Sequence, residues 1–502
     1  MKYCFALLFS LSISLSLFSQ QKNTNGFKCL CEKIGLNNSW ADSNKISCYL
    51  IPVSKNSLKP SDKKYLLAVV VAPALNKHDE EPLLYLHGGP GITTLGNVPR
   101  YLQSKTWKLI REKRSLIFFD YRGTGFSEPE LCAGMEDSLN EFLKTKPTDE
   151  AKNYYTISLY KKCRKDMMLK GTDLSSFSSM QLAADADAIR HELQIATWHL
   201  YGVSFGTRVA LNMLRYHSKN IKSVILDSPW PPNAPWADFV HPFASCFTVL
   251  EKNIAADLVL FSKFPELRND FERAVKRLNK NPAKLKSANG LSESNYSGDD
   301  FAWSVWKAML NPKSIPFLPL AIHEIANGND SILPVWKTAF SSPNTFGKYS
   351  EAQDRAILCF EGRPTTEEES QQSLLLKYPE FSSFNTAFNE RVCNAFRPDI
   401  AGKKIFAPVV SNKPVLILAG EYDPVCPPLF AEITAKTLSK STLIIVPSAS
   451  HAAINADDCI RNIANSFICN PAMNPQIDCV KDRLKIKFVT KDLMKALKDY
   501  KN

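Results

Sequence analysis

A serine between two glycines lies where an apolar run gives way to a helical pattern. The segment HLYGVSFGTRVALNMLRY covers 199–216, and its GVSFG core places Ser204 between Gly202 and Gly206. A serine in a sharp strand-to-helix turn presents its hydroxyl outward, and glycines let the strand and helix approach closely. The pattern therefore predicts a nucleophile at Ser204, against the alternative of a tight turn that happens to contain serine.

A serine hydroxyl is a poor nucleophile near neutral pH, so it needs a base, and the base needs an acid that orients it. In sites built on such a turn, the chain order is Ser, then Asp or Glu, then His. Among the histidines that follow Ser204, His241 and His323 lie outside the strand pattern. His451, in VPSASHAAIN, directly follows the last expected strand, and we expect it to be the base.

The orienting acid is expected in the loop after the preceding strand. The segment VLILAGEYDPVCPP places Asp423 in that loop, with Glu421 two residues before it. Asp227, in VILDSP, also ends an expected strand. We favour Asp423, followed by Asp227 and then Glu421.

An oxyanion formed during attack needs fixed backbone donors. The glycine-rich turn in LYLHGGPG follows a strand-like run, so an N–H there can point at the serine. We assign this role to Gly89, with Gly88 as the alternative, together with the amide of Phe205. We expect His87 to support this loop and not to act as a base.

Short apolar or β-branched runs alternate with amphipathic helical patterns along most of the chain. The expected strands are 65–73, 82–88, 115–122, 198–204, 223–229, 414–420 and 442–448, and the expected crossover helices are 182–193 and 207–216. Strands that alternate with helices predict an α/β fold with a mostly parallel sheet.

The alternation stops between 231 and 410, where the sequence is aromatic-rich and helix-like. We expect this region to be an inserted, largely helical cap domain over the carboxyl ends of the strands. The core then consists of 21–230 and 411–502.

The first twenty residues resemble a secretory signal peptide, with one lysine, a short apolar and serine-rich run and small polar residues. This run is too short and too polar for a stable membrane span. Twelve of the 13 cysteines follow Cys4, an even number that suits disulfides in an oxidising compartment. We therefore expect a secreted or periplasmic protein.

The formal net charge of +12 comes mostly from lysines spread along the chain. Nucleic-acid binding favours basic residues gathered among aromatic ones, which this sequence lacks. We therefore exclude nucleic acid as a partner.

Five segments together resemble the α/β-hydrolase family of proline iminopeptidases, and especially its secreted tripeptidyl aminopeptidase branch. They are HGGPG (87–91), DYRGTGFS (120–127), GVSFG (202–206), GEYDP (420–424) and the segment around His451. The resemblance implies an α/β-hydrolase fold with a cap domain and hydrolysis of peptides from a free N-terminus. The sequence departs from the family at Phe205, where strict proline iminopeptidases usually have tryptophan.

The resemblance also implies further residue roles. Disulfides are implied for Cys132 with Cys163 and Cys459 with Cys479, and more weakly for Cys359 with Cys393. The segment ILCFEGRP resembles the one in which such enzymes hold the substrate's α-ammonium, which makes Glu361 a candidate for amine binding. The alternative is an ordinary surface glutamate beside a disulfide.

The sequence as a whole predicts a secreted serine hydrolase that cleaves short peptides near their N-terminus through Ser204, His451 and Asp423. This chemistry requires no metal and no organic cofactor. One alternative is a carboxylesterase or lipase with the same three residues, because fold and triad do not fix the leaving group. A second is a non-catalytic binding protein on a hydrolase scaffold.

Overall fold

The computed structural model describes residues 27–59, 63–76, 80–145, 147–234, 240–286, 293–340, 349–362, 390–483 and 485–501. The expected signal peptide, residues 1–20, lies outside the described residues. Among the helices of the described ranges, none is long and apolar enough to cross a lipid bilayer.

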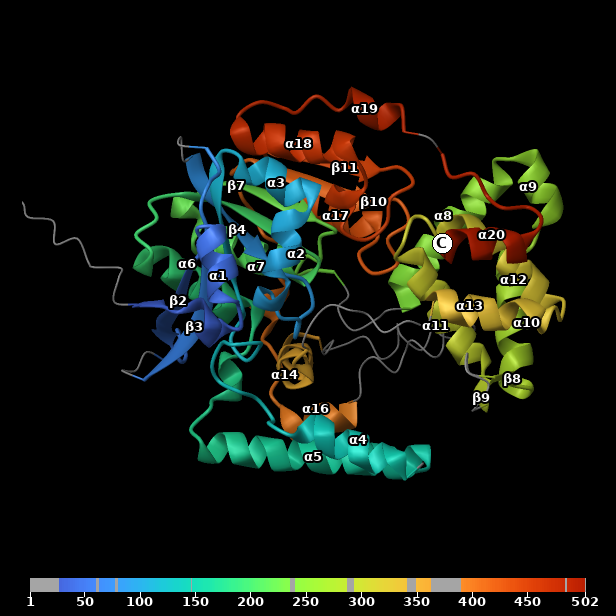
Figure 1. Cartoon of the computed structure of the whole chain (residues 1–502), viewed down its shortest axis with the longest axis horizontal. Coiled ribbons are helices and arrows are strands. Elements are labelled where there is room, and N and C mark those ends of the chain that lie inside the picture. The colour runs from blue at the N-terminus through green and yellow to red at the C-terminus, as the bar shows by residue number, and fades with distance from the viewer. Residues whose placement is uncertain are drawn as a thin grey trace, which may run out of the picture.

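One nine-stranded sheet forms the centre of the larger part of the molecule (Figure 1). Its order is β1-β2-β3-β5-β4-β6-β7-β10-β11. The β1–β2, β2–β3 and β3–β5 pairs are antiparallel, and all other pairs are parallel. The strands are β1 (Lys28–Cys29), β2 (Ser47–Ser54), β3 (Lys64–Ala72), β4 (Glu80–Leu86), β5 (Arg114–Phe119), β6 (Trp198–Val203), β7 (Ile221–Asp227), β10 (Val415–Gly420) and β11 (Ser441–Val446). The expected α/β class with a mostly parallel sheet is confirmed, and β1 and β2 are additions to the expected strands.

Helices cover both faces of this sheet. Successive side chains of a strand point to opposite faces. Accordingly, Leu84 and Leu86 of β4 join one buried apolar cluster, and Leu83 and Tyr85 join another. The first cluster includes side chains of α6 (Ser179–Glu192), α7 (Phe205–Tyr216) and α17 (Pro428–Ala435). The second includes side chains of α1 (Asn38–Ser43), α2 (Val98–Gln103), α3 (Lys105–Arg111) and α18 (Asp458–Cys469).

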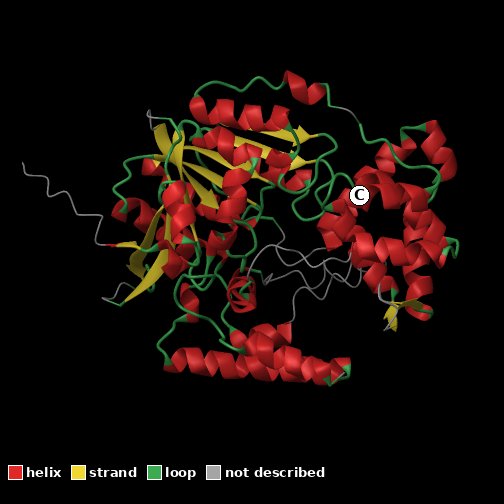
Figure 2. Cartoon of the chain, viewed as in Figure 1, coloured by secondary structure: helices red, strands yellow, loops and turns green. Residues whose placement is uncertain are grey.

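A third apolar cluster lies in a mostly helical unit beside the sheet, which we call the helical lobe (Figure 2). It contains α8 (Val240–Ala255), α9 (Leu258–Lys263), α10 (Leu267–Lys280), α11 (Gly298–Met309), α12 (Leu318–Ala326), α13 (Leu333–Phe340) and the hairpin β8 (Ala283–Lys286) with β9 (Glu293–Tyr296). The C-terminal helix α20 (Leu493–Lys501) joins the lobe because Leu493 and Leu497 are buried in its cluster. This differs from the prediction that all of 411–502 packs with the sheet.

The remainder of the expected insertion packs with the sheet and not with the lobe. Helices α14 (Glu351–Glu361) and α16 (Glu390–Phe396) bury Ile357 and Phe396 in the first sheet cluster. The Phe396 ring contacts Tyr160 of α5 (Asp149–Leu169), which with α4 (Met135–Lys144) forms an outer layer at the bottom of Figure 1. The region 231–410 is therefore divided between two packing units, where the sequence predicted one.

The three disulfides implied by the family resemblance are confirmed. Cys132–Cys163, Cys359–Cys393 and Cys459–Cys479 are bonded, and Cys31–Cys48 forms an unexpected fourth pair. Free thiols among the described residues belong to Cys29, Cys246, Cys426 and Cys469.

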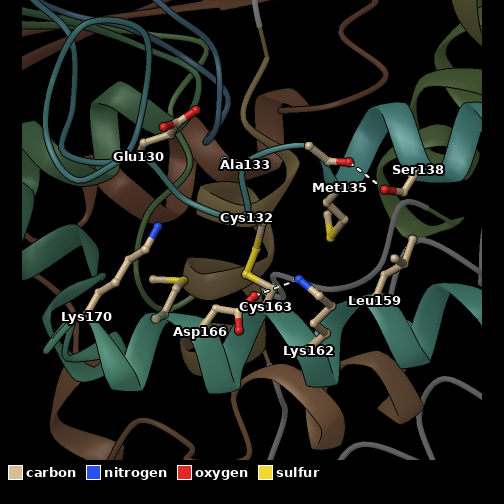
Figure 3. A pocket seen from close by; sticks show the side chains of 12 residues that line it. Glu130, Cys132, Ala133, Met135, Ser138, Leu159, Lys162, Cys163, Asp166 and Lys170 are labelled. Carbon is tan, nitrogen blue, oxygen red and sulfur yellow. Dashed lines mark hydrogen bonds and ion pairs between the residues drawn. A yellow bond between two sulfur atoms is a disulfide. The ribbon is translucent and has the colours of Figure 1, made fainter.

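The Cys132–Cys163 disulfide borders a cavity of about 120 Å³ between the 130–138 segment and α5 (Figure 3). Lys162 and Asp166 pair at 2.9 Å along its rim. No member of the expected triad borders this cavity. The disulfide therefore has a structural role here, because it links α5 to the chain that follows the DYRGTGFS segment.

Candidate active site

Ser204 occupies a strained turn between β6 and α7. Its φ of 54° and ψ of −125° lie outside the usual regions for a residue with a side chain. Such conformations cost on the order of 1–3 kcal/mol and persist only where the surroundings enforce them. A Cβ on Gly206 would overlap the Leu86 carbonyl oxygen, and one on Gly202 would lie 2.6 Å from the Gly206 carbonyl oxygen. The two glycines therefore permit the close strand–helix contact that enforces the turn.

Hydrogen bonds fix the turn on both sides. The Ser204 N–H donates to the Asp227 carbonyl oxygen at 2.9 Å, which ties the turn to β7. The Thr207 hydroxyl donates to the Ser204 carbonyl oxygen at 2.6 Å and accepts the Trp230 N–H at 2.7 Å. The Ser204 side chain thus extends from a backbone that is held from two directions.

Asp423 and His451 are in direct contact. The His451 Nδ1 lies 2.8 Å and 3.0 Å from the two carboxylate oxygens of Asp423. Asp423 is fully buried, and its Oδ1 also accepts the N–H groups of Val425 and Cys426. A carboxylate at Nδ1 favours the tautomer with the proton there, which leaves Nε2 able to accept a proton from a nucleophile.

The pKa of His451 is raised above its ordinary value. Burial alone would lower it, but the charge of Asp423, its hydrogen bond and the charge of Asp227 outweigh that effect. A raised pKa means that the imidazole holds a proton strongly once it has accepted one. This property suits a general base that must later return the proton.

A free thiol lies in the loop that carries the acid. The Cys426 N–H donates to Asp423 at 2.8 Å, and its thiol is fully buried. Burial raises the pKa of this thiol well above its ordinary value, and the nearby charge of Asp423 adds to the rise. Cys426 therefore stays protonated near neutral pH and does not offer a competing thiolate.

The HGGPG loop lies against the serine. A Cβ on Gly88 would be 3.1 Å from the Ser204 Cβ, and Gly89 adopts a φ of 110°, which favours glycine. Phe205 is the first residue of α7, where backbone N–H groups point out of the helix. The N–H groups of Gly89 and Phe205 thus belong to the two backbone segments that flank the serine.

His87 supports this loop as a neutral side chain. Its Nδ1 lies 3.0 Å from the Gly88 carbonyl oxygen, and the Tyr121 hydroxyl donates to the His87 carbonyl oxygen at 3.1 Å. Burial lowers the pKa of His87 to about 4. The imidazole is consequently uncharged near neutral pH.

The DYRGTGFS segment braces the same loop from the other side. Asp120 is fully buried and accepts the N–H groups of Thr94 and Leu95 on one oxygen and that of Phe126 on the other. A Cβ on Gly125 would overlap the Asp120 carboxylate. The sequence alone gave Asp120 no role. In the structure, its carboxylate holds the backbone that follows HGGPG.

Glu361 lies in the interior and is not a surface residue. One carboxylate oxygen accepts the Arg208 Nε–H at 2.8 Å, and both oxygens accept hydrogen bonds from Ser179. The side chains of Glu361 and Arg208 are both fully buried. The surface-glutamate alternative is therefore wrong, and this carboxylate pins α14 to α7. Amine binding by Glu361 stays a prediction.

The helical lobe contacts the loops that carry Asp423 and His451. The Trp306 indole N–H donates to the Pro424 carbonyl oxygen at 3.3 Å. The Ser450 hydroxyl donates to the Met309 carbonyl oxygen at 2.6 Å. Both lobe residues come from the end of α11, so this helix borders the candidate site.

Sequence reasoning gave no role to Cys426 and ranked Asp227 only as an alternative acid. The signal for Cys426 was its position three residues after Asp423, within one loop. Among the described residues, no group of three or more His, Cys, Asp or Glu side chains is arranged to hold a metal ion.

Comparison with known proteins shows which family the chain resembles. The family model for the alpha/beta hydrolase fold matches residues 81–455. The serine protease Hip1 of Mycobacterium tuberculosis is 22% identical over 458 residues, which cover 85% of this chain and 86% of that protein. A probable proline iminopeptidase of Leptolyngbya boryana is 22% identical over 394 residues, which cover 75% of this chain and 83% of that protein.

A solved structure of a proline iminopeptidase from Mycobacterium smegmatis covers 81% of this chain and 95% of its own, with 14% identity and a TM-score of 0.38. The sequence relatives confirm the expected resemblance and support a serine hydrolase. Because the family model covers most of the chain, including the Ser204 turn and His451, the protein belongs to the alpha/beta hydrolase fold family.

Proposed function

We propose that the protein is an exported aminopeptidase that removes one or a few residues from the free N-terminus of short peptides. The observation that carries the proposal is the contact of the buried Asp423 carboxylate with the His451 Nδ1, together with the strained turn that holds Ser204 at the end of β6. This arrangement supplies an acid, a base and a hydroxyl in the order that acyl transfer requires.

In the proposed reaction, Ser204 attacks the carbonyl carbon of the scissile amide while His451 accepts the hydroxyl proton at Nε2. Asp423 orients the imidazole and stabilises its positive charge. The N–H groups of Gly89 and Phe205 stabilise the oxyanion. His451 then protonates the leaving amine, and a water molecule activated by the same imidazole releases the acyl group from Ser204.

An acidic hollow beside the HGGPG loop supports the proposal that the substrate has a positively charged N-terminus. It measures about 650 Å³ and is bordered by Thr93, by 123–137 and by 349–352. Its lining includes five acidic residues and no lysine, arginine or histidine: Glu128, Glu130, Glu136, Asp137 and Glu351. Tyr349 and Ser350 of this lining also contact Gly91 of the loop. A peptide's α-ammonium is therefore favoured near the loop by charge.

We favour this hollow over Glu361 as the amine-binding site, because the Glu361 carboxylate already accepts hydrogen bonds from Arg208 and Ser179. If Glu361 itself bound the ammonium group, Arg208 and Ser179 would have to release it. Replacing Glu361 with glutamine would then slow free-amine peptides more than N-acetylated ones. We expect Glu361→Gln to slow free-amine and N-acetylated peptides equally. The double variant Glu136→Gln with Glu351→Gln should instead lose most of the preference for free-amine peptides.

Export is part of the proposal. Four disulfides join residues between Cys31 and Cys479, as is usual in oxidising compartments. The expected signal peptide at 1–20 supports the same location.

The test is mass spectrometry of products from a mixed peptide library with free and acetylated N-termini. Ser204→Ala is the control for contaminating peptidases. We expect release of N-terminal fragments from free peptides only, and no release by Ser204→Ala. Turnover of short acyl esters with no cleavage of any peptide would contradict the proposal and assign the site to a carboxylesterase. No covalent labelling of Ser204 by a fluorophosphonate would assign the fold to a binding role.

A further inference from the structure

Two residues at the end of β7 contact all three chain segments of the candidate triad. Strand β7 lies between β6, which leads to Ser204, and β10, which leads to Asp423. The Asp227 carbonyl oxygen accepts the Ser204 N–H at 2.9 Å. The Ser228 N–H donates to the Leu418 carbonyl oxygen of β10 at 2.8 Å. The backbone of this dipeptide thus joins the serine turn to the acid strand.

The side chains of the same dipeptide hold the chain that follows His451. The Ser228 hydroxyl accepts the Ala452 N–H at 3.0 Å. The Asp227 Oδ2 accepts the Ile454 N–H at 3.2 Å. These bonds fix the first and third residues after His451, so the direction of the imidazole depends on them.

The local backbone needs such restraint. Ser228 has a φ of 54° and Ala452 a φ of 62°, both in the left-handed region that residues with side chains rarely adopt. Asp227 and Ser228 are fully buried, and the Tyr201 hydroxyl donates to the Asp227 Oδ2 at 2.7 Å. Strained conformations persist where surrounding contacts over-determine them, which is the situation at this pair of residues.

Asp227 does not act as the orienting acid, because both oxygens of Asp423 already face the His451 Nδ1. We propose instead that Asp227 and Ser228 are positioning residues that set the alignment of the His451 imidazole with the Ser204 hydroxyl. The proposal rests on the proposed function of Ser204 and His451 as nucleophile and base. Because a misplacement of about 1 Å can cost on the order of 100-fold in rate, loss of either contact is measurable.

The experiment compares Ser228→Ala with a control on the same strand. Ser223 lies near the other end of β7, is almost fully buried, and its hydroxyl lies 2.7 Å from the His199 Nδ1. Ser223→Ala therefore removes the hydrogen bond of another buried serine on the same strand, away from the triad. Each variant is measured for kcat and KM on one peptide, for the second-order rate of fluorophosphonate labelling, and for the midpoint of thermal unfolding.

We expect Ser228→Ala to lower kcat and the labelling rate by about 10- to 100-fold, with KM within about twofold of the parent enzyme. Ser223→Ala should lose similar thermal stability while keeping kcat within about twofold. Asp227→Ala should behave like Ser228→Ala. Asp227→Asn keeps an oxygen for the Ile454 N–H, so its kcat and labelling rate should be close to those of the parent enzyme. This variant also provides a measurement if Asp227→Ala fails to fold.

Equal kcat and labelling rates in Ser228→Ala and Ser223→Ala would overturn the positioning role. The labelling rates decide this even if no peptide is cleaved, in which case only the aminopeptidase proposal fails. Absence of Ser204 labelling in the parent enzyme would overturn both.

Discussion

Glu361 and Arg208 form an ion pair in which neither side chain reaches solvent. The pair joins α14, which contacts the HGGPG loop through Ser350 and Gly91, to α7, which begins directly after Ser204. Removing one partner of a buried pair leaves the other as an uncompensated charge.

Glu361→Ala is therefore expected to lower the free energy of unfolding by about 3–5 kcal/mol. Urea denaturation followed by tryptophan fluorescence measures the change. The matched control is the double variant Glu361→Leu with Arg208→Met, which removes both charges and should recover most of the loss. A single variant as stable as the parent would show that water or another anion compensates the charge of Arg208.

The activity should fall on the acid side as His451 becomes protonated. Because Asp423 and Asp227 raise the pKa of His451, the acid limb of kcat/KM is expected to have an apparent pKa above the ordinary 6.5. Asp227→Asn removes one of the two charges, so its acid limb should move to lower pH. An acid limb that moves to higher pH in this variant would contradict the charge assignment.

Asp354 on α14 should make stability depend on pH. Burial raises the pKa of its carboxyl to about 7, partly offset by the charge of Arg355 and a hydrogen bond from Tyr349. Between about pH 4 and 7 the folded protein binds this proton and the unfolded chain does not, so the free energy of unfolding falls as pH rises through that window.

Asp354→Asn removes this dependence. The variant is expected to be more stable than the parent at pH 8, by at most about 2–4 kcal/mol, and equal to it near pH 4. Thermal melts at the two pH values provide the measurement. A variant that is less stable at both would show that the ionised carboxylate stabilises the fold.

Gly206→Ala should abolish activity and reduce folding, because the added Cβ overlaps a backbone carbonyl oxygen that cannot swing away. Gly402→Ala is the control, since no atom lies within 4 Å of a Cβ there. Soluble yield and fluorophosphonate labelling compare the two. Near-parental labelling of Gly206→Ala would mean that β4 and α7 can separate without cost.

The strands and the serine turn were predictable from sequence because their signals are local. The apolar run 198–203, the glycines that flank Ser204 and the position of His451 after β11 each occupy one short segment. The resemblance to a known family supplied three disulfide pairs that spacing alone could not fix.

The missed features depend on partners that are distant in the chain. Glu361 meets Arg208 across 153 positions, and Ala452 meets Ser228 across 224. Helix α20 returns to the helical lobe because Leu493 and Leu497 find their apolar partners there. A periodic pattern indicates that a helix has an apolar face, but it does not identify the surface against which that face packs.

The lobe's hydrogen bonds end one residue from each of two key side chains: Pro424 adjoins Asp423, and Ser450 adjoins His451. A change in the lobe is consequently transmitted to the two loops that carry these side chains. Exchanging the lobe for that of a relative, as a protein engineer would do to alter specificity, is expected to displace Asp423 and His451 as well unless the end of α11 is retained.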